Sequence, residues 1–198
     1  MMSDAADPPP DTVDADAPVT ASLRLTPAQR AELEAWCADA YPDEGCGLLI
    51  GPPSAPAGDG RLTYRVRRVT RARNLNVARA RDRYVLDPAD FLAADRAARA
   101  DGLDVVGIWH THPDHPPRPS ITDLEAAWDG YVYLIVRASA DAVGPMRAWQ
   151  LGASRRFVEL DVETDAGAAA ADTRAGADAS KDDALKEPAP HPDAGASS

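Results

Sequence analysis

The sequence predicts an α/β domain in which helices pack on a mixed, mostly antiparallel, curved β-sheet. Apolar segments of strand length alternate with helix-start signals along the chain, which is typical of such layered domains. Two of these signals place a capping residue directly before a proline, in TPAQ at 26–29 and DPAD at 87–90. Near the end, PMRAWQL (145–151) and RRFVELDV (155–162) predict a hairpin that closes the sheet.

The first half of the domain combines one helix with several short strands. The helix begins at the TPAQ signal and is ended by Pro42. CGLLIG (46–51) is then a short apolar strand, closed by a Gly-Pro-Pro turn. Residues 61–69, RLTYRVRRV, alternate apolar with polar side chains, which predicts a half-exposed strand. A turn near residues 74–76 precedes another short strand at 84–86.

The second half contributes the central strands. A helix begins at Asp87 and ends at Gly102. Residues 103–109, LDVVGIW, are apolar enough to form a central strand. We expect a short third helix over 120–128 and a second buried strand at YVYLIVR (131–137).

The acidic charge is concentrated in two terminal segments. Residues 1–20 hold five aspartates and no base, and residues 164–198 hold seven acids against three bases, so little of the net charge of −11 belongs to the part between them. Both ends are rich in Ala, Asp and Pro, a composition that cannot offset the entropy of ordering the chain. We therefore expect disordered acidic tails at 1–21 and 164–198 around one domain at 22–163, which is long enough to bury a core.

Targeting and redox signals are sparse. No charged-then-apolar leader opens the sequence and no apolar run approaches about 18 residues, which predicts a cytoplasmic protein with no membrane partner. Cys37 and Cys46 are too few for a disulfide framework, and we expect both to be small buried residues. The composition leaves the oligomeric state open.

The segment GIWHTHPDHPPRPSITD (107–123) concentrates the groups that can do chemistry. His110 and His112 follow the expected strand, and side chains at i and i+2 of extended backbone point the same way. Imidazole and carboxylate ligands suit zinc, and Asp123 is the natural third ligand after a loop stiffened by prolines. Ser120 to Asp123 also fits a simple helix N-cap, and an isolated H-x-H pattern is weak evidence, so each part taken alone has a structural interpretation.

Taken together, HTHP at 110–113, the seven residues between His112 and Ser120, and the S-x-x-D pattern resemble the motif of the JAMM (MPN-plus, JAB/MPN) metalloproteases. The family also places a glutamate near the end of the first helix, and Glu44 in PDEGCGLLIG matches it. The similarity covers about residues 23–161. The lack of long insertions is similar to the compact prokaryotic branch, and the resemblance implies a cytidine-deaminase-like fold.

The resemblance implies a role for each motif residue. One Zn²⁺ per chain is expected on His110, His112 and Asp123, where it would lower the pKa of bound water to about 7. Glu44 is expected to accept the proton of this water and pass it to the departing amine, and Ser120 to donate a hydrogen bond to the oxyanion. The implied partner is a ubiquitin-like or sulfur-carrier protein, cleaved at an (iso)peptide bond after its C-terminal Gly-Gly. The leaving group, whether a cysteine, a lysine side chain or a C-terminal extension, stays open.

Other functions fit parts of the sequence. A non-catalytic MPN-type interaction module has the same fold but lacks the metal ligands that this chain carries. A deaminase would need H-x-E and P-C-x-x-C patterns, which are missing. A DNA-repair-associated relative of the JAMM fold is favoured only by the nine arginines in residues 61–83. We expect that segment to be a solvated strand face or to dock an acidic protein partner, and nucleic acid is the weaker interpretation.

Three aromatic side chains near the motif need an assignment. His115 matches no ligand position of the family, so we expect it to contact the metal ligands without binding the metal, or to lie at the surface. Trp109 and Trp128 flank the motif, and we expect both to pack in the core.

Overall fold

The computed structural model describes residues 12–14, 21–54, 56 and 61–165. Most of the expected tails lie outside these residues, so their disorder and the domain boundaries stay predictions. Thr12 and Val13 are described and buried, and Val13 forms a bridge with Phe157. This short part of the expected N-terminal tail packs on the domain, which its composition did not indicate.

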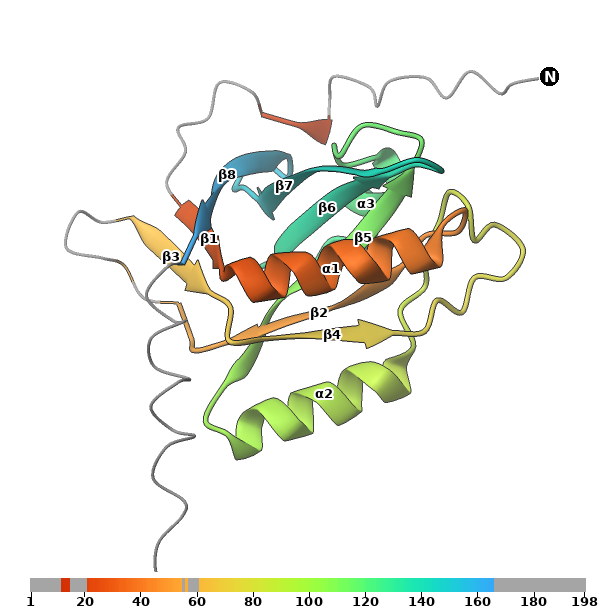
Figure 1. Ribbon diagram of the computed structural model, residues 1–198. Coiled ribbons are helices and arrows are strands. Elements are labelled where there is room, and N and C mark those ends of the chain that lie inside the picture. The colour runs from red at the N-terminus through yellow and green to blue at the C-terminus, as the bar shows by residue number, and fades with distance from the viewer. Residues whose placement is uncertain (1–11, 15–20, 55, 57–60, 166–198) are drawn as a thin grey trace, which may run out of the picture. The chain divides into compact units, whose positions relative to one another are not determined.

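Eight strands form one curled sheet in the described part of the chain (Figure 1). In sheet order they are β3 (Leu62–Arg65), β1 (Ala21–Leu25), β8 (Phe157–Thr164), β7 (Val143–Leu151), β6 (Val132–Ala138), β5 (Asp104–Pro113), β2 (Cys46–Gly51) and β4 (Arg68–Ala72). The pairs β4–β2, β2–β5, β6–β7 and β7–β8 are antiparallel, whereas β5–β6, β8–β1 and β1–β3 are parallel. The predicted mixed, mostly antiparallel sheet is confirmed.

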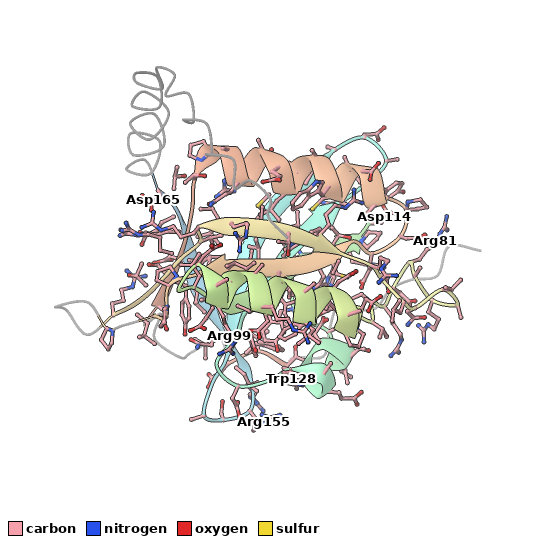
Figure 2. The ribbon with its side chains drawn as sticks, turned by 90° about the horizontal axis from the view of Figure 1, so that it is seen from below. Arg81, Arg99, Asp114, Trp128, Arg155 and Asp165 are labelled. Carbon is pink, nitrogen blue, oxygen red and sulfur yellow. The ribbon has the colours of Figure 1, made fainter. Side chains whose placement is uncertain are left out.

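The described residues also contain three helices, α1 (Pro27–Ala40), α2 (Pro88–Ala100) and α3 (Ile121–Ala126). Thr26 and Ser120 form capping boxes at α1 and α3, and the Asp87 side chain caps α2, as the sequence predicted. α1 and α2 lie on opposite sides of the β2–β4 part of the sheet (Figures 1 and 2). None of these helices is long and apolar enough to cross a membrane.

Alternation along β6 divides the core between the two faces of the sheet. Val132, Leu134 and Val136 belong to a buried cluster that includes residues of α1, while Tyr133 and Ile135 belong to a second cluster that includes Ala127 and Leu124 of the α3 region. Both faces of β6 are therefore covered, which explains why its sequence is apolar almost throughout. β5 lies between β6 and β2, so its residues are held from both sides.

The segment expected as one strand at 61–69 is two strands at opposite ends of the sheet order. β3 pairs with β1, and β4 pairs with β2. Between them, the Val66 N–H donates to the carbonyl of Arg24 in β1, and the Arg67 N–H donates to that of Ile50 in β2. This connection brings the two ends of the sheet together. Residue alternation cannot reveal it, because the pattern is the same whichever partner a strand has.

Three smaller features also differ from the prediction. No sequence pattern indicated β1, which lies between β3 and β8 in the sheet. The strand expected at 84–86 is reduced to a single bridge between Asn74 and Leu86. β5 does not end at Trp109 but continues to Pro113, because β6 pairs with it from Gly107 onward.

Candidate metal centre

β5 presents two histidines on the same face. His110 and His112 lie two residues apart in the strand, on the face opposite Trp109, which packs in the cluster that includes α1. His110 is fully buried and His112 is nearly so. Thr111, between them, accepts a hydrogen bond from the Gly45 N–H at 2.9 Å. The i, i+2 geometry expected from the sequence is present.

Asp123 approaches the histidines from the first turn of α3. The Ser120 hydroxyl accepts a hydrogen bond from the Asp123 N–H at 3.2 Å, and Asp123 Oδ2 accepts one from the Ser120 N–H at 2.7 Å. The Ser120 hydroxyl also donates to Asp123 Oδ2 at 2.7 Å. The capping box therefore fixes the direction of the carboxylate, and helix capping and metal ligation are compatible at this residue.

Contacts from distant parts of the chain fix the proline-rich loop between β5 and α3. The carbonyl of Pro117 accepts a hydrogen bond from Trp149 Nε1 of β7 at 3.1 Å. The carbonyl of Pro119 accepts one from the Thr12 hydroxyl at 3.1 Å. Since proline also restricts the backbone, the loop has little freedom to move Asp123 away from β5.

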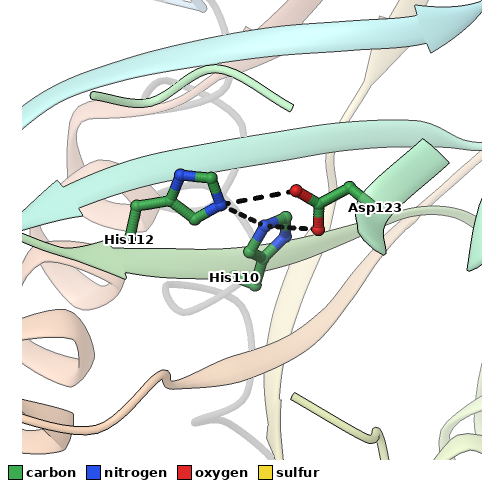
Figure 3. Close-up of side chains that lie close together, drawn as sticks. All are labelled: His110, His112 and Asp123. Atoms are coloured by element: carbon green, nitrogen blue, oxygen red, sulfur yellow. Dashed lines mark hydrogen bonds and ion pairs between the residues drawn. The ribbon is translucent and has the colours of Figure 1, made fainter. Parts of the chain in front are cut away.

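The three side chains converge as Figure 3 shows. His110 Nε2 lies 3.1 Å from His112 Nε2 and 3.2 Å from Asp123 Oδ1, and His112 Nε2 lies 3.5 Å from Asp123 Oδ2. Ligand atoms about 2.1 Å from a tetrahedral zinc ion lie about 3.4 Å apart, so this spacing fits zinc. His112 Nδ1 lies 2.9 Å from the carbonyl of Pro116, a contact that holds the ring with Nε2 toward the site. Two imidazoles and a carboxylate would leave a fourth position open.

The electrostatics of the cluster favour the metal-binding forms of Asp123 and His110. Burial raises the pKa of Asp123, but the charges and hydrogen bonds of the two histidines outweigh it, and the net shift is far downward. Burial lowers the pKa of His110 more than Asp123 raises it. Burial also lowers the pKa of His112, but the hydrogen bond to Asp123 and its charge outweigh this, so the net shift is upward. An ionised carboxylate beside a neutral His110 is suited to a cation.

Glu44 lies in the same cavity as two of the candidate ligands. This cavity has a volume of about 680 Å³, and Glu44, His112 and Asp123 all line it. Burial is the main cause that raises the pKa of Glu44 to about 8, and the charge of His112 partly opposes it. Pairing of β2 with β5 sets this position, because Cys46 lies opposite His110 and Glu44 precedes it by two residues. The structure thus brings Glu44 together with the HTHP and SITD motifs.

Ser120 and His115 line the cavity as well. The Ser120 hydroxyl is hydrogen bonded to Asp123, so donation to an oxyanion requires the hydroxyl to turn toward the cavity. That role stays a proposal. His115 is half-buried and does not belong to the three-residue ligand cluster found in the described residues.

Two residues without an assigned role in the sequence analysis support the site. The Tyr84 ring stacks on His110, with ring centroids 4.6 Å apart. The Asn74 side-chain amide donates to the carbonyls of Glu44 and Arg83, each at 3.1 Å, and its oxygen accepts two further backbone N–H groups. The turn expected near Asn74 was the only signal for this, since asparagine favours turns.

The two tryptophans that flank the motif have different environments. Trp109 is fully buried, as predicted. Trp128 is 64% exposed at the surface and forms part of the cavity wall, so the prediction that it packs in the core is wrong (Figure 2). Cys37 and Cys46 are both buried, as expected.

The arginine-rich segment 61–83 does not form one unpaired basic patch. Its residues are spread over β3, β4 and the loop that follows. Most of them lie within ion-pair distance of an aspartate, namely Arg61, Arg65, Arg68, Arg71, Arg73 and Arg79. Such pairing reduces the positive field that a docking or nucleic-acid surface would need. The segment agrees better with a solvated, ion-paired strand face.

Residues 26–152 match the family described as prokaryotic homologs of the JAB domain. The chain belongs to this family. The resemblance inferred from the HTHP and SITD motifs is therefore confirmed, and the ligand cluster lies inside the matched range.

Two relatives of this JAB-family chain are named desampylase. The one from Haloferax volcanii is 40% identical over 97 residues, which are 48% of this chain and 62% of the relative. The one from Pyrococcus furiosus is 33% identical over 121 residues, 60% of this chain and 74% of the relative. The match thus spans less than two thirds of the Haloferax protein.

Two structures solved in solution support the JAB-family fold. A protein from Desulfitobacterium hafniense superposes with a TM-score of 0.60 at 28% identity, covering 73% of this chain and 92% of that protein. A protein from Salinibacter ruber gives a TM-score of 0.54 at 42% identity, covering 72% and 91% of the two chains.

Proposed function

We propose that this JAB-family protein is a zinc-dependent peptidase or isopeptidase that cleaves the bond after the C-terminal Gly-Gly of a ubiquitin-like or sulfur-carrier protein. The observation that carries the proposal is the convergence of His110, His112 and Asp123 at the wall of a cavity that His112, Asp123 and Glu44 line. The two relatives named desampylase support the substrate class. We further propose a cytoplasmic location.

Each site residue has a task in this reaction. Bound zinc would supply a water of lowered pKa and polarise the substrate carbonyl. Glu44 accepts one proton from the attacking water and delivers it to the departing nitrogen, so that hydrolysis of the C–N bond yields a carboxylate and an amine. Its burial favours this role, because a raised pKa near neutrality suits a group that must both take and give a proton. The Ser120 hydroxyl donates to the developing oxyanion.

The test uses the full chain and a panel of small host proteins that end in Gly-Gly, each extended at its C-terminus. We expect about one zinc per chain by metal analysis, and cleavage after Gly-Gly by mass spectrometry. Glu44→Gln should keep the metal and lose at least about a hundredfold in turnover, because the proton carrier is removed. Glu125→Gln is the matched control, because Glu125 is an exposed acid on α3 and should retain full activity.

Two results would contradict the proposal. Full activity in zinc-free protein would remove the metal from the mechanism. Undiminished turnover of Glu44→Gln would show that Glu44 is not the proton carrier of the reaction.

A further inference from the structure

Two arginines of the cavity differ from most of those in segment 61–83. Arg83 and Arg118 both line the cavity and are half-buried. Within the part of the chain that the structure describes, neither lies within ion-pair distance of an acid, and the buried Nε of Arg118 has no hydrogen-bond partner. A buried donor without an acceptor is costly, so the Nε of Arg118 indicates a site for a ligand that supplies the acceptor, and Arg83 adds a second unpaired charge to the same cavity.

The acidic side chains of the cavity have other partners or form no pair with these arginines. Asp123 contacts both histidines, and Asp82 forms an ion pair with Arg79. Glu44 lines the cavity but forms no ion pair with Arg83 or Arg118 among the described side chains. The unused positive charge is therefore available for an anion that enters from outside.

Arg83 stands beside Glu44. The Asn74 side chain donates to the backbone carbonyls of both residues, which holds them next to each other. The Arg83 charge is also near enough to lower the pKa of Glu44, against the larger effect of burial. Because Glu44 hands its proton to the departing nitrogen in the proposed reaction, Arg83 lies on the side where the leaving group sits.

We propose that Arg83 and Arg118 bind the α-carboxylate of the departing residue, so that the preferred substrate carries a single extra residue with a free carboxyl end after its Gly-Gly. This inference rests on the proposed function and names its leaving group. The carboxylate and the departing nitrogen share one carbon atom in such a substrate, so a group beside Glu44 can reach it. A guanidinium can bind a carboxylate through two parallel N–H···O bonds.

The rest of the cavity strengthens this recognition. Val85, Phe91, Ile108 and Trp128 contribute apolar wall to the same space. A charge pair that is partly shielded from water is stronger than one in bulk solvent. A lysine joined through its side chain inside a folded protein has its α-carboxyl group in a peptide bond, so it cannot offer this anion.

The experiment compares matched substrates of one Gly-Gly-ending protein that the zinc-loaded enzyme cleaves. The first is extended by alanine with a free carboxylate, the second by alanine amide, and the third by aspartate amide, which places a carboxylate only on the side chain. We expect kcat/KM for the free carboxylate to exceed that for alanine amide by about tenfold or more, as for a lost charged hydrogen bond. Aspartate amide should react like alanine amide.

Variants test whether the two arginines cause the preference. In Arg83→Gln, Arg118→Gln and the double variant, the ratio of kcat/KM for the carboxylate over the amide should fall toward one. The ratio is the readout because loss of Arg83 also changes the surroundings of Glu44 and so affects every substrate. Arg81→Gln is the matched control and should keep the wild-type ratio, because Arg81 is exposed at the periphery and does not line the cavity (Figure 2).

The outcomes separate the two proposals. Equal cleavage of alanine and alanine amide by the wild type would overturn the inference while leaving the peptidase intact, and this comparison needs no variant to fold. A preference that survives in the double variant, or that extends to aspartate amide, would also overturn it. No cleavage of any Gly-Gly fusion by zinc-loaded protein would instead overturn the proposed function, and the inference with it.

Discussion

Glu44 shows how burial changes the pKa of a single side chain in the metal-free protein. The side chain is 6% exposed, and burial raises its pKa from 4.5 to about 8. Between these values the folded protein holds a proton that the unfolded chain releases, so the free energy of unfolding falls as pH rises from about 4.5 to about 8.

The first prediction concerns the stability of zinc-free Glu44→Gln. Glutamine does not ionise, so this variant should be more stable than the wild type at pH 8 by about 1 kcal/mol or more, which is about 2–4 °C in the unfolding midpoint. Near pH 4.5 the difference should be much smaller. Thermal unfolding of chelator-treated protein at both pH values checks this, with Glu125→Gln as the control. The same stability difference at both pH values would contradict it.

Tyr84 is the residue that holds the ring of His110. A histidine ligand usually donates its second ring N–H to a nearby acceptor, but His110 Nδ1 is buried and has no hydrogen-bond partner among the described residues. Stacking by Tyr84 takes over the orienting task. The pKa of Tyr84 is raised by burial, so the phenol is neutral and its ring is the relevant part.

Tyr84→Leu should therefore weaken zinc binding by about tenfold or more. Losing a group that orients a metal-binding side chain typically has an effect of this size. Tyr84→Phe keeps the stacked ring and should bind zinc like the wild type. Competition with a chromophoric zinc chelator measures both affinities. Equal losses in the two variants would show that the hydroxyl, and not stacking, is what matters.

At the level of elements, the site depends on hydrogen bonds between the loop that follows β4 and the segment just before β2. Asn74 binds the carbonyl of Glu44 and three other backbone groups between residues 76 and 85. It therefore links the residue before β2 to the loop that carries Tyr84 and Arg83. Together with the hydrogen bond from the Glu44 N–H to the Ala80 carbonyl at 2.6 Å, this side chain fixes the relative position of two segments that share no strand pairing.

Asn74→Ala should lower the free energy of unfolding by about 2 kcal/mol, since four hydrogen bonds to backbone groups, three of them partly buried, are lost together. Turnover should fall together with stability, because Glu44 loses one of its two backbone hydrogen bonds to this loop. Asn76→Ala is the control, since Asn76 accepts only an exposed bond from the Arg79 N–H. Urea unfolding and peptidase assays measure the two effects, and equal behaviour of the two variants would contradict the role of Asn74.

The sequence predicted where helices begin better than it predicted which strands pair with each other. Both long helices begin at the predicted caps, because a cap is a local interaction within four residues. The strand at 61–69 was placed wrongly as one piece, because its break at Val66 and Arg67 follows from hydrogen bonds to β1 and β2. Those partners lie far away in the sequence, so no local pattern contains them.

At the scale of the whole molecule, β4, β2 and β5 pack so closely around Gly47 that this position accepts only glycine. A Cβ on Gly47 would lie 1.9 Å from the carbonyl oxygen of Thr70 and 2.4 Å from Trp109 Nε1. These two groups are themselves joined by a hydrogen bond of 2.9 Å. A side chain here would therefore push apart the strands that hold Glu44 and the histidines.

Gly47→Ala should lower the free energy of unfolding by about 1–3 kcal/mol or more, as overpacking does. Gly144→Ala should lower it by less than Gly47→Ala does, because a Cβ there comes no closer than 3.2 Å to its nearest neighbour, the Cβ of Arg137, and a shift of a few tenths of an ångström relieves this contact. Urea unfolding of both variants measures the difference. A Gly47→Ala variant as stable as the wild type would show that the strands can separate at this point.

The sequence by itself determined the pair of candidate ligands on one strand face and the capped helix start that carries Asp123, because strand alternation and capping are local properties. The candidate base Glu44 came from the resemblance to the JAMM family. The tertiary structure alone decided that Glu44 shares a cavity with His112 and Asp123, that Tyr84 stacks on His110 while Asn74 binds the backbone of Glu44, and that Trp128 is exposed. It also separated Arg83 and Arg118 from the paired arginines. These features depend on which distant segments meet, and that is set by sheet pairing and curvature, which no single stretch of sequence records.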